Sequence, residues 1–150
     1  MTLDHLIAVY PDGRYAECGN SYEQIKAAMN GATIDLVGLP DGHGFFVDDN
    51  GMIEELTMNV PASIFASIAL FGPVVLCGPP DAEGETLPPD ERVANGFLAL
   101  TMMWRKVCMD ALRKGQRILV AADSSTIPPA QVISLTDEEF DAYLRGEWEP

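Results

Sequence analysis

Short hydrophobic runs, each closed by a turn signal, fill the first half of the chain. The run 3–10 ends at Pro11-Asp12-Gly13. Proline fixes φ and glycine permits a left-handed backbone, so this tripeptide predicts a turn followed by a return strand through Tyr15.

Three further runs have the length and the apolar character of strands. They cover 33–37, 44–47 and 74–77. Asn50-Gly51 stands between the run 44–47 and the next apolar run, 52–56. This dipeptide favours a tight two-residue turn, so a hairpin is predicted at this point.

Helical spacing and capping residues predict four helices. Ser21 with Gln24, and Thr136 with Glu139, match the capping-box pattern at the start of a helix. Pro61 suits a first helical turn, and Asn59 before it is expected to cap that helix with about 1 kcal/mol. The predicted helices cover 21–30, 61–70, 91–114 and 137–144.

The third of these helices is unusually long and has a wide apolar face. Its apolar residues alternate in steps of four and three, as in a heptad stripe. A helix of about 24 residues spans roughly 36 Å, more than the core of a chain of this size covers easily. We therefore expect part of this face to form a homodimer contact, through Phe97, Leu100, Trp104 and Val107.

These elements predict one α+β domain over 1–150. Its sheet is expected to be mixed, mainly antiparallel, with five to seven short strands and about four helices. The stretch 78–89 is rich in proline and carboxylates and cannot be regular structure, because proline lacks the amide donor. With the long helix and a strand at 118–121 it forms a candidate elaboration over about 78–130.

Charge is segregated along the chain. The net charge is −14, and outside residues 92–122 there are 22 acidic residues against three basic ones, whereas inside that window six basic residues face Asp110 alone. Nucleic acids and anionic membranes require a positive field, so neither is an expected partner. A basic partner, or solubility alone, fits better. No apolar stretch approaches the roughly 20 residues that span a bilayer, and the expected location is the cytoplasm.

Candidate chemistry is sparse. His5 and His43 have no second ligand at a useful spacing, so no metal site and no cofactor are expected. The three cysteines form no CxxC pair and are interpreted as buried thiols. No nucleophile motif is recognisable. An enzymatic hypothesis would require His43 within hydrogen-bonding reach of a carboxylate at the floor of a cleft.

Several turn and core segments carry a resemblance to a known family. They are Ile34–Gly38, Phe46–Gly51, Leu56–Ser63, Phe71–Gly78 and the closing Val132–Phe140, about half of the chain. They resemble an uncharacterised family of phage- and plasmid-borne proteins of the domain-of-unknown-function 3846 type. The resemblance implies an origin in a mobile element and transfers no activity.

Two functional hypotheses follow. The first is a non-enzymatic phage-type accessory protein that binds and diverts a basic or nucleic-acid-binding host protein in the host cytoplasm, for host takeover or counter-defence. Its acidic contact residues would be Asp48, Asp49, Glu54, Glu55, Asp81, Glu83 and Glu85.

The alternative is an oligomer that sequesters a small signalling nucleotide. Arginine and lysine bind phosphate, and the basic cluster of the long helix is the only concentration of such residues in the sequence. The ligand-binding residues would then be Arg105, Lys106, Arg113 and Arg117.

Overall fold

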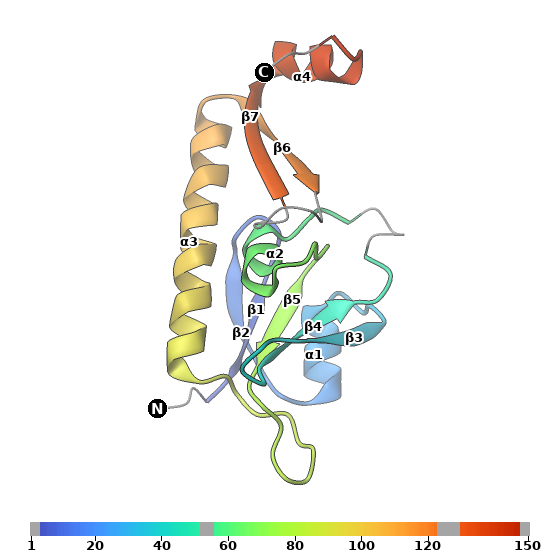
Figure 1. Cartoon of the computed structure of the whole chain (residues 1–150), viewed down its shortest axis with the longest axis vertical. Coiled ribbons are helices and arrows are strands. Elements are labelled where there is room, and N and C mark those ends of the chain that lie inside the picture. Colours follow the sequence, from blue (N-terminus) through green and yellow to red (C-terminus); the bar gives the residue numbers. More distant parts are fainter. Residues whose placement is uncertain (1–3, 52–55, 123–129, 148–150) are drawn as a thin grey trace.

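A computed structural model describes residues 4–51, 56–122 and 130–147 of the chain (Figure 1). Its centre is a five-stranded sheet with the strand order β2-β1-β5-β4-β3. All four neighbouring pairs in this sheet are antiparallel. The strands are β1 (Leu6–Val9), β2 (Tyr15–Cys18), β3 (Ile34–Gly38), β4 (Gly44–Asp48) and β5 (Val74–Cys77).

Helices cover both faces of this sheet. On one face α2 (Val60–Ala66) and α3 (Glu91–Arg113) pack against the sheet through Phe45, Phe65 and Phe97. The ring centroids of these three residues lie 4.9–6.0 Å apart. On the other face, α1 (Tyr22–Ala28) contributes Ile25 to a second core. Because both faces are covered, β1 and β5 are buried at every position, which explains their continuous apolar runs.

A separate antiparallel hairpin follows α3. It consists of β6 (Gln116–Ala122) and β7 (Ala130–Thr136), and it lies beside the second half of α3 (Figure 1). The last element, α4 (Asp137–Leu144), begins directly after β7. Among the described residues, no helix combines the length and the hydropathy needed to cross a bilayer.

The predicted helices are confirmed, although the first two end earlier than predicted. Both capping boxes form, since the Ser21 Oγ accepts from the Gln24 N–H and the Thr136 Oγ1 accepts from the Glu139 N–H. The helix predicted over 61–70 ends at Ala66, because Ser67 takes a left-handed backbone with φ 58°. The α+β class is also confirmed.

Two details of the sheet differ from the sequence-based prediction. The strand pairs among the described residues are all antiparallel, and they form two sheets instead of one. A turn exists at Asp48–Gly51, where the Gly51 N–H donates to the Asp48 carbonyl at 3.2 Å. The return strand predicted at 52–56 falls mostly on 52–55, which lie outside the described residues. The neighbours of β4 in the sheet are β3 and β5.

Candidate functional site

Strand β3 forms one edge of the five-stranded sheet. Its inner side pairs with β4, and within the described residues no strand pairs with its outer side. The Asp49 N–H donates to the Thr33 carbonyl, and the Leu39 N–H donates to the His43 carbonyl. Since bonded and non-bonded pairs alternate in an antiparallel ladder, the backbone groups of the intervening even-numbered residues point outward. These residues are Ile34, Leu36 and Gly38.

One carboxylate is bonded to this edge. The Oδ1 of Asp35 accepts a hydrogen bond from the Leu36 N–H at 2.8 Å. Leu36 supplies the middle one of the three outward amides, so the Asp35 carboxylate occupies the central outward donor of this edge. Charged residues at exposed edges are a known protection against uncontrolled strand pairing.

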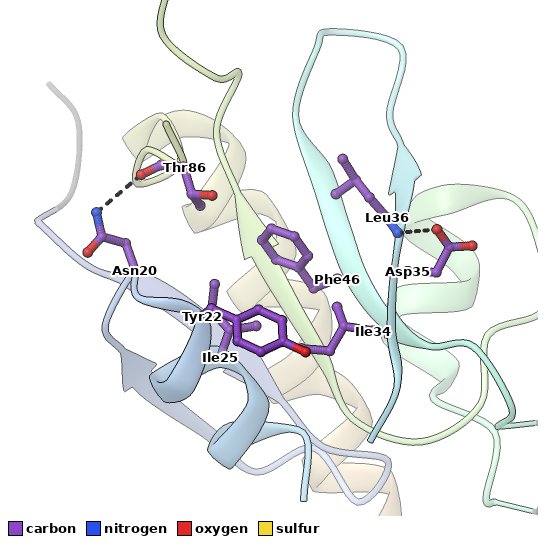
Figure 2. A pocket seen from close by; sticks show the side chains of 8 residues that line it. All are labelled: Asn20, Tyr22, Ile25, Ile34, Asp35, Leu36, Phe46 and Thr86. Atoms are coloured by element: carbon purple, nitrogen blue, oxygen red, sulfur yellow. Dashed lines mark hydrogen bonds between the residues drawn. The ribbon is translucent and has the colours of Figure 1, made fainter. Parts of the chain in front are cut away.

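An apolar hollow of about 370 Å³ lies beside this edge, on the α1 face of the sheet (Figure 2). Ile25, Ile34 and Phe46 line it, with Leu36 and Tyr22 also contributing. Leu36 is 55% exposed and Tyr22 is 62% exposed, so both apolar surfaces are open to solvent. A hydrogen bond of 3.2 Å from the Asn20 amide to the Thr86 carbonyl ties the 78–89 loop to the rim.

The hollow exists because α1 is short. Its seven residues cover β1, β2 and β5 through Ile25, and the chain then turns through Asn30 and Gly31 at positive φ. The outer part of the same face, around Phe46 and Leu36, therefore has less cover. These two residues are register partners across β3 and β4, so their side chains share one face of the sheet.

The hairpin of β3 and β4 is uniformly acidic. Residues 33–51 contain four aspartates and no lysine or arginine. Sequence reasoning included Asp48 and Asp49 but did not single out Asp35, Leu36, Phe46 or Tyr22 as a site. The feature that marks this site is the exposure of Leu36. It follows from the position of β3 at the edge of the sheet, which the sequence alone does not show.

The predicted acidic contact residues do not form one face. Asp48 and Asp49 lie at the end of β4, whereas Asp81, Glu83 and Glu85 lie in the loop that follows β5 at the opposite end of the sheet (Figure 1). The length of β4, about 16 Å, separates these two ends. In the loop, the Asp81 Oδ1 accepts from the Glu83 and Glu85 amides and organises a turn. Glu54 and Glu55 lie outside the described residues.

The predicted basic cluster is dispersed and partly neutralised within the chain. Arg105 contacts Asp12 at 3.5 Å, Arg113 contacts Asp110 at 3.7 Å, and Arg117 contacts Asp137 at 3.0 Å. Arg117 also stacks over the Phe140 ring at 4.7 Å. Lys106 lines an open groove between α2 and α3, together with Asp110. The structure does not bring the four residues into one pocket.

Two of the four predicted dimer-contact residues are buried in their own chain, which corrects that part of the prediction. Phe97 is fully buried against the sheet. Trp104 is buried as well, and its Nε1 donates to the Pro11 carbonyl at 2.7 Å. The sheet and the β1–β2 turn supply the cover that was expected from a second subunit. Leu100 and Val107 line the groove between α2 and α3 with Met103, and Trp104 contributes its small exposed part to the same groove.

His43 meets the condition of the enzymatic hypothesis in distance only: its Nδ1 lies 3.1 Å from the Asp41 Oδ1 but forms no hydrogen bond with it. It is 6% exposed and lines a cavity of about 590 Å³ with Asp90. However, its Nε2 already accepts a hydrogen bond from the Asp90 N–H at 3.0 Å. The nitrogen that a general base would use is therefore occupied, and the residues lining this cavity include no serine, cysteine, threonine or lysine. The geometry gives His43 an anchoring role.

The environments of the three cysteines disfavour the thiolate form. Burial raises the pKa of the Cys77 thiol to about 11 and also raises the pKa of Cys18 and Cys108. Thiolates are the reactive and metal-binding form, so a raised pKa suppresses both chemistries. Within the described part of the chain, no three His, Cys, Asp or Glu side chains lie close enough together to hold a metal ion.

Together, these features define an α+β protein with an antiparallel sheet, helices on both faces and an acidic, partly open edge. Comparison with models of protein families then identifies the family of this chain. The chain belongs to the family described as a domain of unknown function (DUF3846), whose model matches residues 5–100. This confirms the resemblance, although the similar segment at 132–140 lies beyond the match. The match ends inside α3, and the candidate elaboration over 78–130 stays a prediction. No curated protein and no solved structure matches the chain.

Proposed function

We propose that this chain is a non-enzymatic accessory protein of phage type that binds a basic host protein and diverts it, for host takeover or counter-defence. The observation that carries the proposal is the β3–β4 hairpin, which combines four aspartates, no lysine or arginine, and an edge strand with outward amides. A basic surface would be attracted to such a hairpin and could form contacts beyond charge alone.

The rest of the charge distribution supports the same partner class. A net charge of −14 steers cationic surfaces toward the protein and repels nucleic acids. Three of the arginines on α3 and β6 contact carboxylates of their own chain. These residues thus contribute little positive field, and this weakens the support for the nucleotide-binding alternative.

The experiment is a salt titration with a purified partner. A host protein retained by the tagged chain at low salt is purified, and its affinity is measured by calorimetry as the salt concentration rises. Exposed charges are screened beyond about 8 Å at physiological ionic strength, so the affinity should fall steeply with salt. Retention of every partner in 1 M salt contradicts the proposal.

Matched variants locate the contact. Asp35→Asn with Asp49→Asn removes two charges from the hairpin, and Glu83→Gln with Glu85→Gln removes two from the 78–89 loop. We expect only the hairpin pair to weaken binding, because the two sets lie at opposite ends of the sheet. Equal weakening by both pairs would mean that binding depends only on the net charge of the protein and not on the hairpin.

The proposal of a homodimer through α3 now rests on Leu100 and Val107 with Met103, because Phe97 and Trp104 are buried within the chain. Val107 is 43% exposed and Met103 is 67% exposed. Sedimentation velocity of the wild type and of Val107→Asp measures this directly. The expected result is a dimer that the substitution converts to a monomer, and a monomeric wild type contradicts it.

A further inference from the structure

We propose that the partner binds as an added β-strand on the outer edge of β3, through an extended segment in which apolar and basic residues alternate. This inference rests on the proposed function and specifies its mode of binding. The partner segment needs both apolar and basic residues, because one face of the sheet at β3 has an apolar hollow and the other carries the Asp35 carboxylate.

The edge supplies the backbone part of the interaction. Ile34, Leu36 and Gly38 present their amides and carbonyls outward, since the odd-numbered residues between them pair with β4. An extended segment laid along this edge can continue the hydrogen-bond ladder of the sheet. Such strand addition draws its affinity from main-chain bonds and its specificity from pockets for alternate side chains.

The α1 face supplies the apolar part. A residue of the added strand that lies opposite Leu36 projects to the same face as Leu36 and Phe46. It therefore enters the hollow that these residues line with Ile25, Ile34 and Tyr22 (Figure 2). Filling the hollow would remove the exposed Leu36 and Tyr22 surfaces from water, which favours an apolar side chain.

The other face supplies the charge. Residues of the added strand opposite Asp35 and Val37 project to the other face of the sheet. There Asp35, which also lines the rim of the hollow, supplies a negative charge (Figure 2). A carboxylate favours a cation there. Because Asp35 lies between Ile34 and Leu36 on β3, the matching segment places a basic residue opposite Asp35 and apolar residues on either side of it.

Asp35 also controls access to the edge. Its carboxylate holds the Leu36 N–H, so an incoming strand must displace it before the central ladder bond can form. A lysine or arginine on that strand gives the displaced carboxylate a new partner. A second copy of β3 brings no such cation, because residues 33–51 contain no lysine or arginine, and it adds a like charge. The same residue thus admits a basic strand and disfavours self-pairing.

The test uses the full chain, labelled with 15N, and three short synthetic peptides. The first alternates lysine with valine or leucine. The second has the same composition with lysines and apolar residues in separate blocks, and the third repeats the first with alternate backbone amides N-methylated. We expect the first peptide to bind about tenfold more tightly than the other two. It should also slow the hydrogen exchange of the Leu36 amide.

Two substitutions isolate the role of Asp35. Asp35→Asn keeps an acceptor for the Leu36 N–H but removes the charge, and we expect it to weaken binding of the alternating peptide about tenfold. Glu17→Gln makes the same charge change on β2, the opposite edge of the sheet, and should leave the affinity unchanged. Asp35→Ala removes both charge and acceptor, and should increase concentration-dependent self-association in sedimentation.

The outcomes separate this inference from the proposed function. Equal binding of all three peptides, with unchanged exchange at Leu36, overturns strand addition and leaves an acidic surface that binds cations. Shifts at Phe46 and Tyr22 without protection at Leu36 show that a peptide side chain fills the hollow without strand pairing, and also overturn strand addition. If the host partner binds with no salt dependence, the proposed function itself fails, whatever the peptides do.

Discussion

The Nε2 of His43 accepts a hydrogen bond from the backbone N–H of Asp90 at 3.0 Å, across 47 positions of sequence. His43 lies in the turn between β3 and β4, and Asp90 is the N-cap of α3. An imidazole nitrogen that accepts such a bond carries no proton, so in the neutral ring the proton is on Nδ1, beside Asp41. This hydrogen bond joins the acidic hairpin to the start of the long helix, in addition to the packing of Phe45 against Phe97.

Replacing His43 by alanine should therefore destabilise the fold. The substitution removes a buried acceptor and leaves the Asp90 N–H unsatisfied, which costs about 1–3 kcal/mol. The midpoint of urea unfolding, followed by circular dichroism, measures the loss. His5→Ala is the matched control, because the His5 side chain is half exposed and meets only the exposed Glu17 at 3.6 Å. If His43→Ala and His5→Ala unfold at the same urea concentration, the anchoring role of His43 is contradicted.

Asn59 is expected to contribute more to the free energy of unfolding than a helix cap alone does. Its Oδ1 accepts from the Ala62 N–H at 3.2 Å, while its Nδ2 donates to the carbonyls of Val9 and Gly72 at 3.0 Å each. The side chain is fully buried, so Asn59→Ala leaves these groups without a partner. We expect a loss of about 2–4 kcal/mol in the free energy of unfolding, against about 1 kcal/mol for a cap alone.

Asn59→Asp distinguishes the two roles. Aspartate caps helices as well as asparagine does, so a residue that only capped α2 would tolerate the change. Here the new carboxylate oxygen would face two carbonyl oxygens in the protein interior. The variant should be at least as unstable as Asn59→Ala in the same urea titration, and wild-type stability would reduce Asn59 to a cap.

Cys77 should make stability depend on pH in the alkaline range. Its folded-state pKa is raised to about 11 from an ordinary value of 9.0, because burial disfavours the thiolate. Between these values the unfolded state has lost the proton that the folded state still holds. The stability contributed by this group is therefore present below pH 9 and is lost as pH rises toward 11. Cys77→Ala should show a weaker decline over this range than the wild type.

Thiol labelling provides an independent check on Cys77. At pH 8 a thiol with a pKa of about 11 is about one-thousandth thiolate, roughly a hundredfold less than an unperturbed thiol. Mass spectrometry after brief alkylation should find Cys77 unmodified in the folded protein and modified in urea. Rapid labelling of Cys77 under native conditions would contradict its burial.

Local signals predicted most of the elements, because those signals act within a few residues. Ser21 with Gln24, and Thr136 with Glu139, fixed helix starts that the structure reproduces. The capping role of Asn59 was also predicted, but its two bonds to Val9 and Gly72 were not. These contacts depend on how β1 and β5 approach α2, which no local pattern encodes.

The candidate site was harder to predict because it depends on strand order. The sequence pattern around Leu36 predicts a core residue of a strand. In the structure Leu36 is exposed, because β3 is the outermost strand of the sheet. The same limitation misplaced Phe97 and Trp104. Their helical stripe was recognised correctly, but whether the sheet or a second subunit covers it is a tertiary question.

Hydrogen–deuterium exchange of the chain, alone and bound to its purified host partner, tests the central claim most directly. Strand addition to β3 should slow exchange over residues 34–38 and leave the 81–85 loop unchanged. Protection confined to the 81–85 loop or to the groove between α2 and α3, with residues 34–38 exchanging as fast as in the free protein, would contradict the account.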